Sequence, residues 1–269
     1  MRPDGKNIVV TGGGNGMGRE LVLLLLQKGA RVTAVDMNES RLDETKMLAG
    51  NHAKQLTLHK LDITDRDMVL KFPQQLQNLY SHIDGIINNA GIIQPFVRVN
   101  DLQFSDIEHV MNVNFYGSLN MIKAFLPELL TRPEAQIVNI SSMGGFLPVP
   151  GQSVYGASKA AVKLLSEALY AELKSTSVRV SVVFPGGIVT NIAENSGIIM
   201  DRNAPNAEKI ATIKLMPAPV AAKIILEGME KNKTRIYVGK DSFMLNLLYR
   251  FSPGMATDII GKKMGSLLP

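Results

Sequence analysis

The sequence contains no cysteine among its 269 residues. This absence excludes disulfide bonds, thiolate metal sites and a thiol nucleophile, although it does not identify a cellular compartment. Histidine is also scarce, and the histidines present are not spaced as metal ligands. We interpret them as surface or packing residues and expect no metal site; they are His52, His59, His82 and His109.

Long apolar runs are absent as well. The longest near the amino terminus, LVLLLL at 21–26, is far shorter than the ~20 residues that span a bilayer. The first expected strand begins at residue 7, which leaves no room for a signal peptide, so we expect a cytoplasmic protein. The net charge of +5 is modest and the basic residues are spread along the chain, so we expect no nucleic-acid partner.

Short β-branched runs alternate with longer segments in which apolar residues recur at every third or fourth position. This alternation predicts an α/β fold, a doubly wound Rossmann-type parallel sheet of seven strands with helices on both faces. The expected strands are 7–11, 31–36, 56–60, 84–89, 136–141, 179–185 and 235–239. We expect one catalytic domain over 1–239, with an irregular substrate loop at about 187–217, and an apolar and basic extension over 240–269.

The first strand runs into a glycine-rich loop, TGGGNGMG at 11–18, whose glycines do not have the spacing G-x-G-x-x-G. Such a loop can bring backbone N–H groups and a helix N-terminus to a phosphate, although a glycine-rich turn without a ligand is the alternative. Asp36 ends the second strand, where a carboxylate can accept hydrogen bonds from ribose hydroxyls and would repel a 2′-phosphate. The loop and this carboxylate together favour NAD, with NADP as the weaker alternative.

The loop and a series of later motifs together resemble the short-chain dehydrogenase/reductase family, whose loop reads T-G-x-x-x-G-x-G. The later motifs, in the family's order, are NNAG at 88–91, NVNFYG at 112–117, IVNISS at 137–142, YGASK at 155–159 and PGGIVT at 185–190. The resemblance covers about residues 5–190. It implies an NAD(H)-dependent oxidoreductase that interconverts a secondary alcohol and a ketone, and a homodimer or homotetramer.

The spacing Y-x-x-x-K, which places two side chains on one helical face, occurs as Tyr155–Lys159 and again as Tyr170–Lys174. Ligands of open α/β sheets bind outside the carboxyl ends of the strands. Tyr155 lies in the first turn of the expected helix, near that edge, whereas Tyr170 lies about 22 Å further along it. We therefore interpret the first pair as functional and the second as structural.

The resemblance implies a role for each catalytic residue. Tyr155 would be the general acid and base, and Lys159 would lower its pKa and hold the nicotinamide ribose. Ser142, which the family's spacing favours over Ser141, would hold the substrate oxygen. Asn114 would anchor a water that links the lysine to solvent.

The resemblance also implies a cofactor-binding set. It comprises Gly12, Asn15, Gly16, Met17, Gly18, Asp36, Met37, Asp62, Ile63, Asn89, Ala90, Gly91, Tyr155, Lys159, Pro185, Gly186, Ile188 and Thr190. Two of these, Asn15 and Met37, stand where NADP-preferring relatives commonly carry a basic residue, and so favour NAD.

Apolar residues near the site predict a lipophilic alcohol or ketone as substrate, unless they pack the loop onto the domain. They are Phe146, Leu147, Val149, Ile192, Ile198, Ile199 and Met200. The 240–269 extension could rest weakly on a membrane surface, cover the active site or form a subunit contact. Two other functions stay open: a non-catalytic NAD-binding sensor or scaffold, and a membrane-surface lipid reductase.

Overall fold

The computed structural model describes residues 1–77, 79–198 and 215–265. Its main sheet is parallel throughout, with the strand order β3-β2-β1-β4-β5-β6-β9. The strands are β1 (Asn7–Thr11), β2 (Arg31–Asp36), β3 (Leu56–Lys60), β4 (Gly85–Asn88), β5 (Ala135–Ile140), β6 (Val178–Pro185) and β9 (Arg235–Val238). The predicted seven-stranded α/β fold is confirmed, and each strand end lies within one residue of its expected position.

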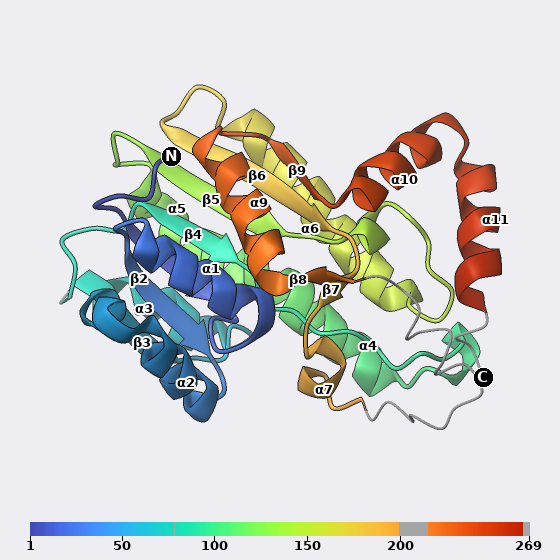
Figure 1. Ribbon diagram of the computed structural model, residues 1–269, viewed down its shortest axis with the longest axis horizontal. Helices are drawn as coiled ribbons and strands as arrows, with labels where there is room; N and C mark the ends of the chain where they lie inside the picture. The colour runs from blue at the N-terminus through green and yellow to red at the C-terminus, as the bar shows by residue number, and fades with distance from the viewer. Residues whose placement is uncertain (78, 199–214, 266–269) are drawn as a thin grey trace.

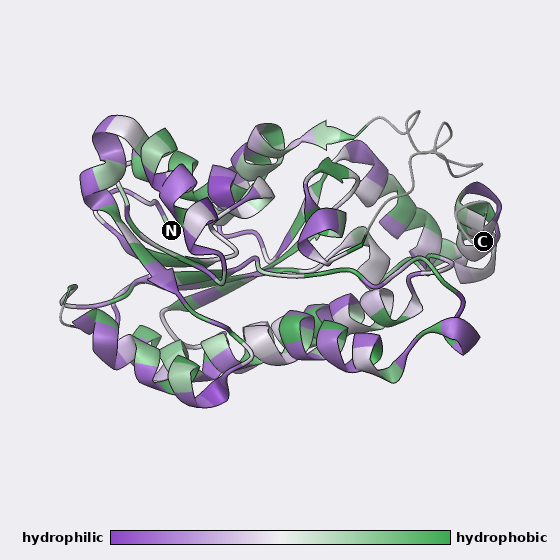
Figure 2. Ribbon diagram, turned by 90° about the horizontal axis from the view of Figure 1, so that it is seen from below, coloured by the Kyte–Doolittle hydropathy of each residue, from purple (hydrophilic) through white to green (hydrophobic). Residues whose placement is uncertain are grey.

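Helices cover both faces of the sheet (Figure 1; Figure 2, seen from below). One face carries α1 (Gly16–Gln27), α2 (Glu39–Ala49) and α9 (Ala218–Glu230). The other carries α3 (Arg66–Gln77), α5 (Ser118–Leu129) and α6 (Ser153–Glu172). None of the helices in the described ranges is long and apolar enough to cross a membrane.

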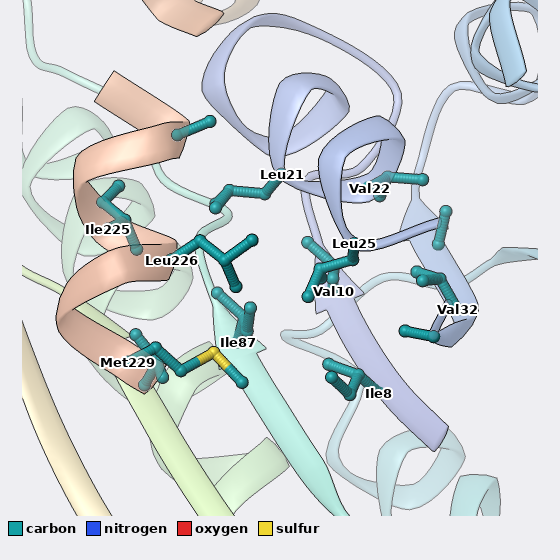
Figure 3. Close-up of a cluster of buried hydrophobic side chains, with 14 of the residues drawn as sticks. Ile8, Val10, Leu21, Val22, Leu25, Val32, Ile87, Ile225, Leu226 and Met229 are labelled. Atoms are coloured by element: carbon teal, nitrogen blue, oxygen red, sulfur yellow. The ribbon is translucent and has the colours of Figure 1, made fainter. Parts of the chain in front are cut away.

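The two cores follow from the alternation of side chains along each strand. In β1, Ile8 and Val10 point to the first face and Val9 to the second. Figure 3 shows Ile8 and Val10 beneath Leu25 of α1, with Met229 of α9 beside them. Strand β1 is buried on both faces, which explains the apolar run Ile8–Val10 at its centre.

The chain reverses direction across the sheet at β1. It moves outward through β2 and β3 and then returns to β4 on the other side of β1. In open α/β sheets, ligands bind at the carboxyl ends of the strands beside such a switch point. The loops after β1 and β4 therefore lie at the expected position of a binding site.

Several short elements surround that edge. After β4 come η2 (Val99–Asp101) and α4 (Phe104–Met111), which continues through a π-helical turn η3 (Asn112–Gly117) into α5. The predicted irregular region contains β7 (Ile188–Val189), α7 (Ile192–Asn195) and β8 (Met216–Pro217), and β7 pairs with β8. The remaining short turns are η1 (Gly50–Gln55) and η4 (Met143–Gly145).

The 240–269 extension forms two helices, α10 (Lys240–Phe251) and α11 (Pro253–Met264). They lie at one end of the molecule, far from α2 (Figure 1). Their inner side packs on the segment 143–149, where Leu147, Ala256 and Ile260 form a separate buried cluster. The extension is thus attached to a segment that was expected to line the substrate site.

Candidate functional site

A cleft of about 600 Å³ opens at the switch point. Every expected site residue lines it except Gly18 and Asn114. The lining residues from the expected set are Gly12, Asn15, Gly16, Met17, Asp36, Met37, Asp62, Ile63, Asn89, Ala90, Gly91, Ser142, Tyr155, Lys159, Pro185, Gly186, Ile188 and Thr190. The cleft runs from the glycine-rich loop and the end of β2 to the first turn of α6.

The glycine-rich loop turns sharply because Gly12 and Gly16 have φ values of +67° and +53°. L side chains rarely adopt this left-handed region, so glycine suits both positions. Asn15 caps α1, and its side-chain oxygen accepts the Gly16 N–H at 2.7 Å. The loop therefore directs the N-terminus of α1, with its unpaired N–H groups, into the cleft.

Gly18 lies behind the cleft. A Cβ atom there would lie 2.0 Å from the Gly12 carbonyl oxygen and 2.4 Å from Asn89 Nδ2. Gly18 therefore allows α1 to pack directly against the loop. This placement gives it a supporting position under Gly12 instead of a position on the cleft surface.

Asp36 holds a fixed carboxylate at the adenosine end that the sequence predicts. Its Oδ2 accepts the Gly14 N–H at 3.0 Å and its Oδ1 accepts the Asn38 N–H at 3.1 Å. Asn38 caps α2 by accepting the Arg41 N–H, so Asp36 is not the cap. The Arg41 guanidinium reaches across to α7, where it pairs with Glu194 at 3.4 Å.

Tyr155 and Ser142 meet at the other end of the cleft. Tyr155 lies in the first turn of α6, and both Tyr155 and Ser142 line the cleft. Tyr155 is partly exposed as a residue, but burial of the phenol raises the pKa of Tyr155, and hydrogen bonding to Ser142 opposes this rise. The neighbouring Ser141 points away from Tyr155 and donates to the Lys159 carbonyl oxygen at 2.7 Å.

Lys159 is almost completely buried, with 4% of its surface exposed. Its Nζ donates to the Ile140 carbonyl oxygen at 3.1 Å. Burial lowers the pKa of Lys159 to about 8. Burial and Ser142 are the influences on the pKa of Tyr155 in the empty cleft, and the lowering of that pKa by Lys159 stays a prediction.

A buried ammonium without a carboxylate partner should cost the protein stability. The pKa of Lys159 falls from 10.5 to about 8, so between these values the unfolded chain binds a proton that the folded protein does not. Stability should therefore rise with pH through this window. Lys159→Met should flatten the rise and, at neutral pH, increase the free energy of unfolding by up to about 3 kcal/mol.

Urea unfolding without nucleotide, at pH 7 and pH 10, measures this effect. Lys174→Met is the matched control, because Lys174 is exposed and lies beyond the end of α6. Equal pH dependence in the wild type and Lys159→Met would contradict a costly buried ammonium.

Asn114 is fully buried, and its side-chain amide forms hydrogen bonds with Ile92 and Ser158. Its Oδ1 accepts the Ile92 N–H at 2.9 Å, and its Nδ2 donates to the Ile92 carbonyl at 3.0 Å and to Ser158 Oγ at 2.9 Å. Ser158 in turn donates to the Tyr155 carbonyl at 2.7 Å. Asn114 thus fastens the loop after β4 to the first turn of α6, and the π-helical turn presents it there.

Gln94 has a positioning role that no sequence motif marks. It is completely buried, and its Oε1 accepts the N–H groups of Val154 at 2.8 Å and Tyr155 at 2.9 Å. Its Nε2 donates to Gly151, and the Gln152 amide donates back to the Gln94 carbonyl. Two of the otherwise unpaired N–H groups at the start of α6 are satisfied in this way.

Gln94→Met should leave these two part-buried N–H groups without their acceptor. A fully buried group of this kind costs about 1–3 kcal/mol, so we expect a lower free energy of unfolding, by less than that cost for each group. Since one of the groups belongs to Tyr155, kcat should also fall more than KM rises. Steady-state kinetics and urea unfolding measure both effects, with Gln75→Met on the exposed side of α3 as control. An unchanged kcat would show that Gln94 does not position Tyr155.

Other residues at and beside the cleft were not assigned these positions from sequence. Thr11 begins the glycine-rich loop behind the cleft, and its Oγ1 accepts the N–H groups of Asn89 at 3.0 Å and Ala90 at 3.1 Å, which joins the ends of β1 and β4. His109, which we interpreted as a surface or packing residue, is exposed but lines the cleft. The further lining residues outside the expected sets are Val35, Asn38, Arg41, Leu61, Ile92, Ile93, Val113, Ile140, Ser141 and Asn195.

The expected apolar substrate wall is only partly present. Ile192 lines the cleft, but Leu147 is buried in the cluster under α10 and α11, and Phe146 and Val149 pack on that cluster. The apolar contacts of this segment with the extension explain the difference. Ile199 and Met200 lie outside the described residues.

Comparison with known proteins identifies the family. The family model of the short chain dehydrogenases matches residues 6–198. The chain belongs to the short-chain dehydrogenase/reductase family. The match confirms the resemblance drawn from the motifs and makes the protein a member of an oxidoreductase family.

Full-length relatives and solved structures agree with this membership. SadH of Mycobacterium tuberculosis, which is named as an oxidoreductase, is 33% identical over 99% of this chain and 98% of its own. A short-chain dehydrogenase/reductase from Burkholderia phymatum in complex with NAD shares the fold, with a TM-score of 0.84 and 23% identity over 93% of this chain and 94% of that chain. A short-chain dehydrogenase from Burkholderia cenocepacia in complex with NADP has a TM-score of 0.79 and 26% identity over 97% and 99%.

Proposed function

We propose that this protein is an NAD(H)-dependent oxidoreductase that interconverts a secondary alcohol and a ketone, with Tyr155 as the general acid and base. The observation that carries the proposal is the grouping of Tyr155, Ser142 and the buried Lys159 in the lining of one cleft. The other end holds the fixed Asp36 carboxylate.

The residues present fit a dinucleotide. A cleft of about 600 Å³ lies in the size range of cofactor sites. The start of α1 suits a pyrophosphate, and Asp36 suits a pair of ribose hydroxyls. A Cβ on Gly91 would lie 3.0 Å from Lys159 Nζ, so glycine keeps the approach to that ammonium open.

When bound, the nicotinamide supplies the hydride acceptor or donor. The protein's own residues manage the substrate oxygen. Ser142 donates a hydrogen bond that holds this oxygen beside the Tyr155 hydroxyl. In oxidation, Tyr155 takes the proton from the alcohol at its phenol oxygen, and in reduction it returns a proton to the carbonyl oxygen.

The raised pKa of Tyr155 affects which direction of the reaction its phenol favours and whether it needs a positive charge nearby. A phenol that keeps its proton is ready to act as an acid, which suits reduction, whereas oxidation needs phenolate. Lys159 lines the same cleft and supplies a positive charge that can favour that phenolate when the site is occupied, and its ammonium can also hold a ribose hydroxyl. Asn114 and Gln94 act indirectly, by holding the first turn of α6.

The choice of NAD over NADP rests on the adenosine end. Two backbone N–H groups fix the Asp36 carboxylate, and the neighbouring Met37 and Asn15 carry no charge. Arg41 is paired with α7 and so is already engaged. One solved relative is a complex with NAD and the other a complex with NADP. The proposal of NAD therefore rests on these local residues of the chain.

Asp36→Ala should raise the ratio of kcat/KM for NADP over NAD by about tenfold or more, because the change removes both the ribose acceptor and the repulsion of a 2′-phosphate. Initial rates with each cofactor at limiting concentration measure the ratio. Asp43→Ala, on the exposed side of α2, is the control. No shift in the ratio would refute the role assigned to Asp36.

The cleft also supports a lipophilic substrate. Ile92, Ile93 and Ile192 line it from the loop after β4 and from α7. A lipophilic alcohol or ketone would bury apolar surface against them, whereas a charged sugar would lose hydration without a charged partner. Turnover with a series of secondary alcohols of increasing chain length tests this point, and kcat/KM should rise with length.

A further inference from the structure

Helix α10 is apolar on its outer side as well as on part of its inner side, where Leu245, Leu248 and Tyr249 pack on the protein. Ser242 is fully buried and donates from Oγ to the Phe184 carbonyl at 2.8 Å, and Asn246 is also buried. An ordinary surface helix carries polar residues on its outer side. The inner side of α10 is thus anchored by polar contacts as well as by packing, and its outer side needs a separate explanation.

The outer side is apolar along its whole length. Phe243 is 52% exposed, Met244 64%, Leu247 43% and Phe251 82%. Their spacing of three and four residues places them on one helical face. Met255 at the start of α11, 55% exposed, extends the stripe. Such a continuous apolar stripe is typical of an interaction surface.

The charges around this stripe are mostly basic. Segment 240–269 has four basic residues and two acidic ones. Lys240 and Arg250 flank the stripe on α10, and both are exposed. Asp241 is exposed as well, and its carboxylate lies beside Gly186, where a Cβ would be 2.5 Å from it. The exposed side of α10 therefore presents apolar side chains between two cations, with one acidic residue next to Lys240.

A second copy of the chain fits this surface poorly. In an antiparallel pairing of two α10 helices about a two-fold axis, Lys240 of one copy would face Arg250 of the other. In a parallel pairing, Lys240 would face its own equivalent. Both arrangements place like charges opposite each other, next to an apolar stripe that the pairing removes from water. A surface of anionic lipid headgroups over acyl chains complements both features.

We propose that the face formed by Phe243, Met244, Leu247, Phe251 and Met255, with Lys240 and Arg250 beside it, docks on an anionic membrane surface. The helices lie at the end of the molecule, where nothing in the described part of the chain covers this face (Figure 1). Their inner side holds the 143–149 segment next to Ser142.

Vesicle co-sedimentation of the full chain tests this directly. The protein should sediment with vesicles of phosphatidylcholine mixed with phosphatidylglycerol, far less with phosphatidylcholine alone, and less as NaCl is raised. Met244→Glu/Leu247→Glu should weaken the association by about tenfold or more. Met47→Glu/Leu48→Glu is the matched control, because these residues are similarly exposed on α2 at the opposite end.

Three results would overturn the proposal. The first is that the protein sediments with neither kind of vesicle. The second is that the matched control loses as much vesicle association as Met244→Glu/Leu247→Glu does. The third is that Met244→Glu/Leu247→Glu converts a wild-type dimer to a monomer while the wild type shows no vesicle binding. The last result would assign the face to a second copy. Thermal unfolding of each variant confirms that it is folded. Because vesicle binding needs neither nucleotide nor turnover, its failure is distinguishable from failure of the proposed oxidoreductase activity.

Discussion

Tyr155→Phe is expected to lower turnover by about 10³-fold while leaving NADH binding within a factor of about two. The change removes only the hydroxyl that exchanges a proton with the substrate oxygen, and the ring keeps its packing in the first turn of α6. Stopped-flow or steady-state rates, together with a fluorescence titration of NADH, measure the two quantities separately. Ser142→Ala should show the same pattern to a smaller degree, because Ser142 positions the oxygen without exchanging the proton.

The second Y-x-x-x-K pair supplies the control for this experiment. Tyr170 lies on the same helix as Tyr155, is 41% exposed and does not line the cleft. Tyr170→Phe should therefore turn over at the wild-type rate. Undiminished turnover in Tyr155→Phe would remove Tyr155 from the chemistry. A wild-type protein that binds NADH but oxidises or reduces no substrate would favour a non-catalytic binding role.

Gly18→Ala is expected to lower the free energy of unfolding by about 3 kcal/mol and to weaken NADH binding. The new methyl would lie 2.0 Å from the Gly12 carbonyl oxygen, a backbone atom that cannot move without shifting the loop. Overpacking of this kind costs about 1–3 kcal/mol or more, which outweighs the gain of about 1 kcal/mol in helix propensity. Urea unfolding and NADH titration measure the two effects.

Gly261→Ala separates the effect of helix propensity from the effect of packing the added methyl group. Gly261 lies within α11, and a Cβ atom there would meet nothing within 4 Å. This variant should be more stable than the wild type by about 0.5–1 kcal/mol. Destabilisation of both variants by the same amount would contradict the close packing assigned to Gly18, since only Gly18 has a backbone atom in the way.

The strands and the cofactor loop were predictable because local patterns determine them. β-branched runs buried on both faces marked the strands, as in β1, and the helix-starting position of Tyr155 placed it at the ligand edge. The family motifs indicate most of the residues that line the cleft. Positions with a distinctive local pattern were therefore the ones that sequence reasoning placed well.

The unpredicted features depend on contacts between segments that are distant in sequence. Gln94 caps α6 across about sixty residues, and no local pattern signals an acceptor there. The burial of Lys159, and with it the lowered pKa, comes from the surrounding strands and loops. Leu147 looked like substrate lining because its packing partners lie in α11, more than a hundred residues later.

A crystal structure of the protein grown with NAD would test the central proposal most directly. We expect the adenosine ribose hydroxyls on the Asp36 carboxylate, the pyrophosphate at the start of α1, and the nicotinamide ring beside Tyr155 and Ser142. A dinucleotide bound outside this cleft, or bound with its nicotinamide at the Asp36 end, would contradict the proposal.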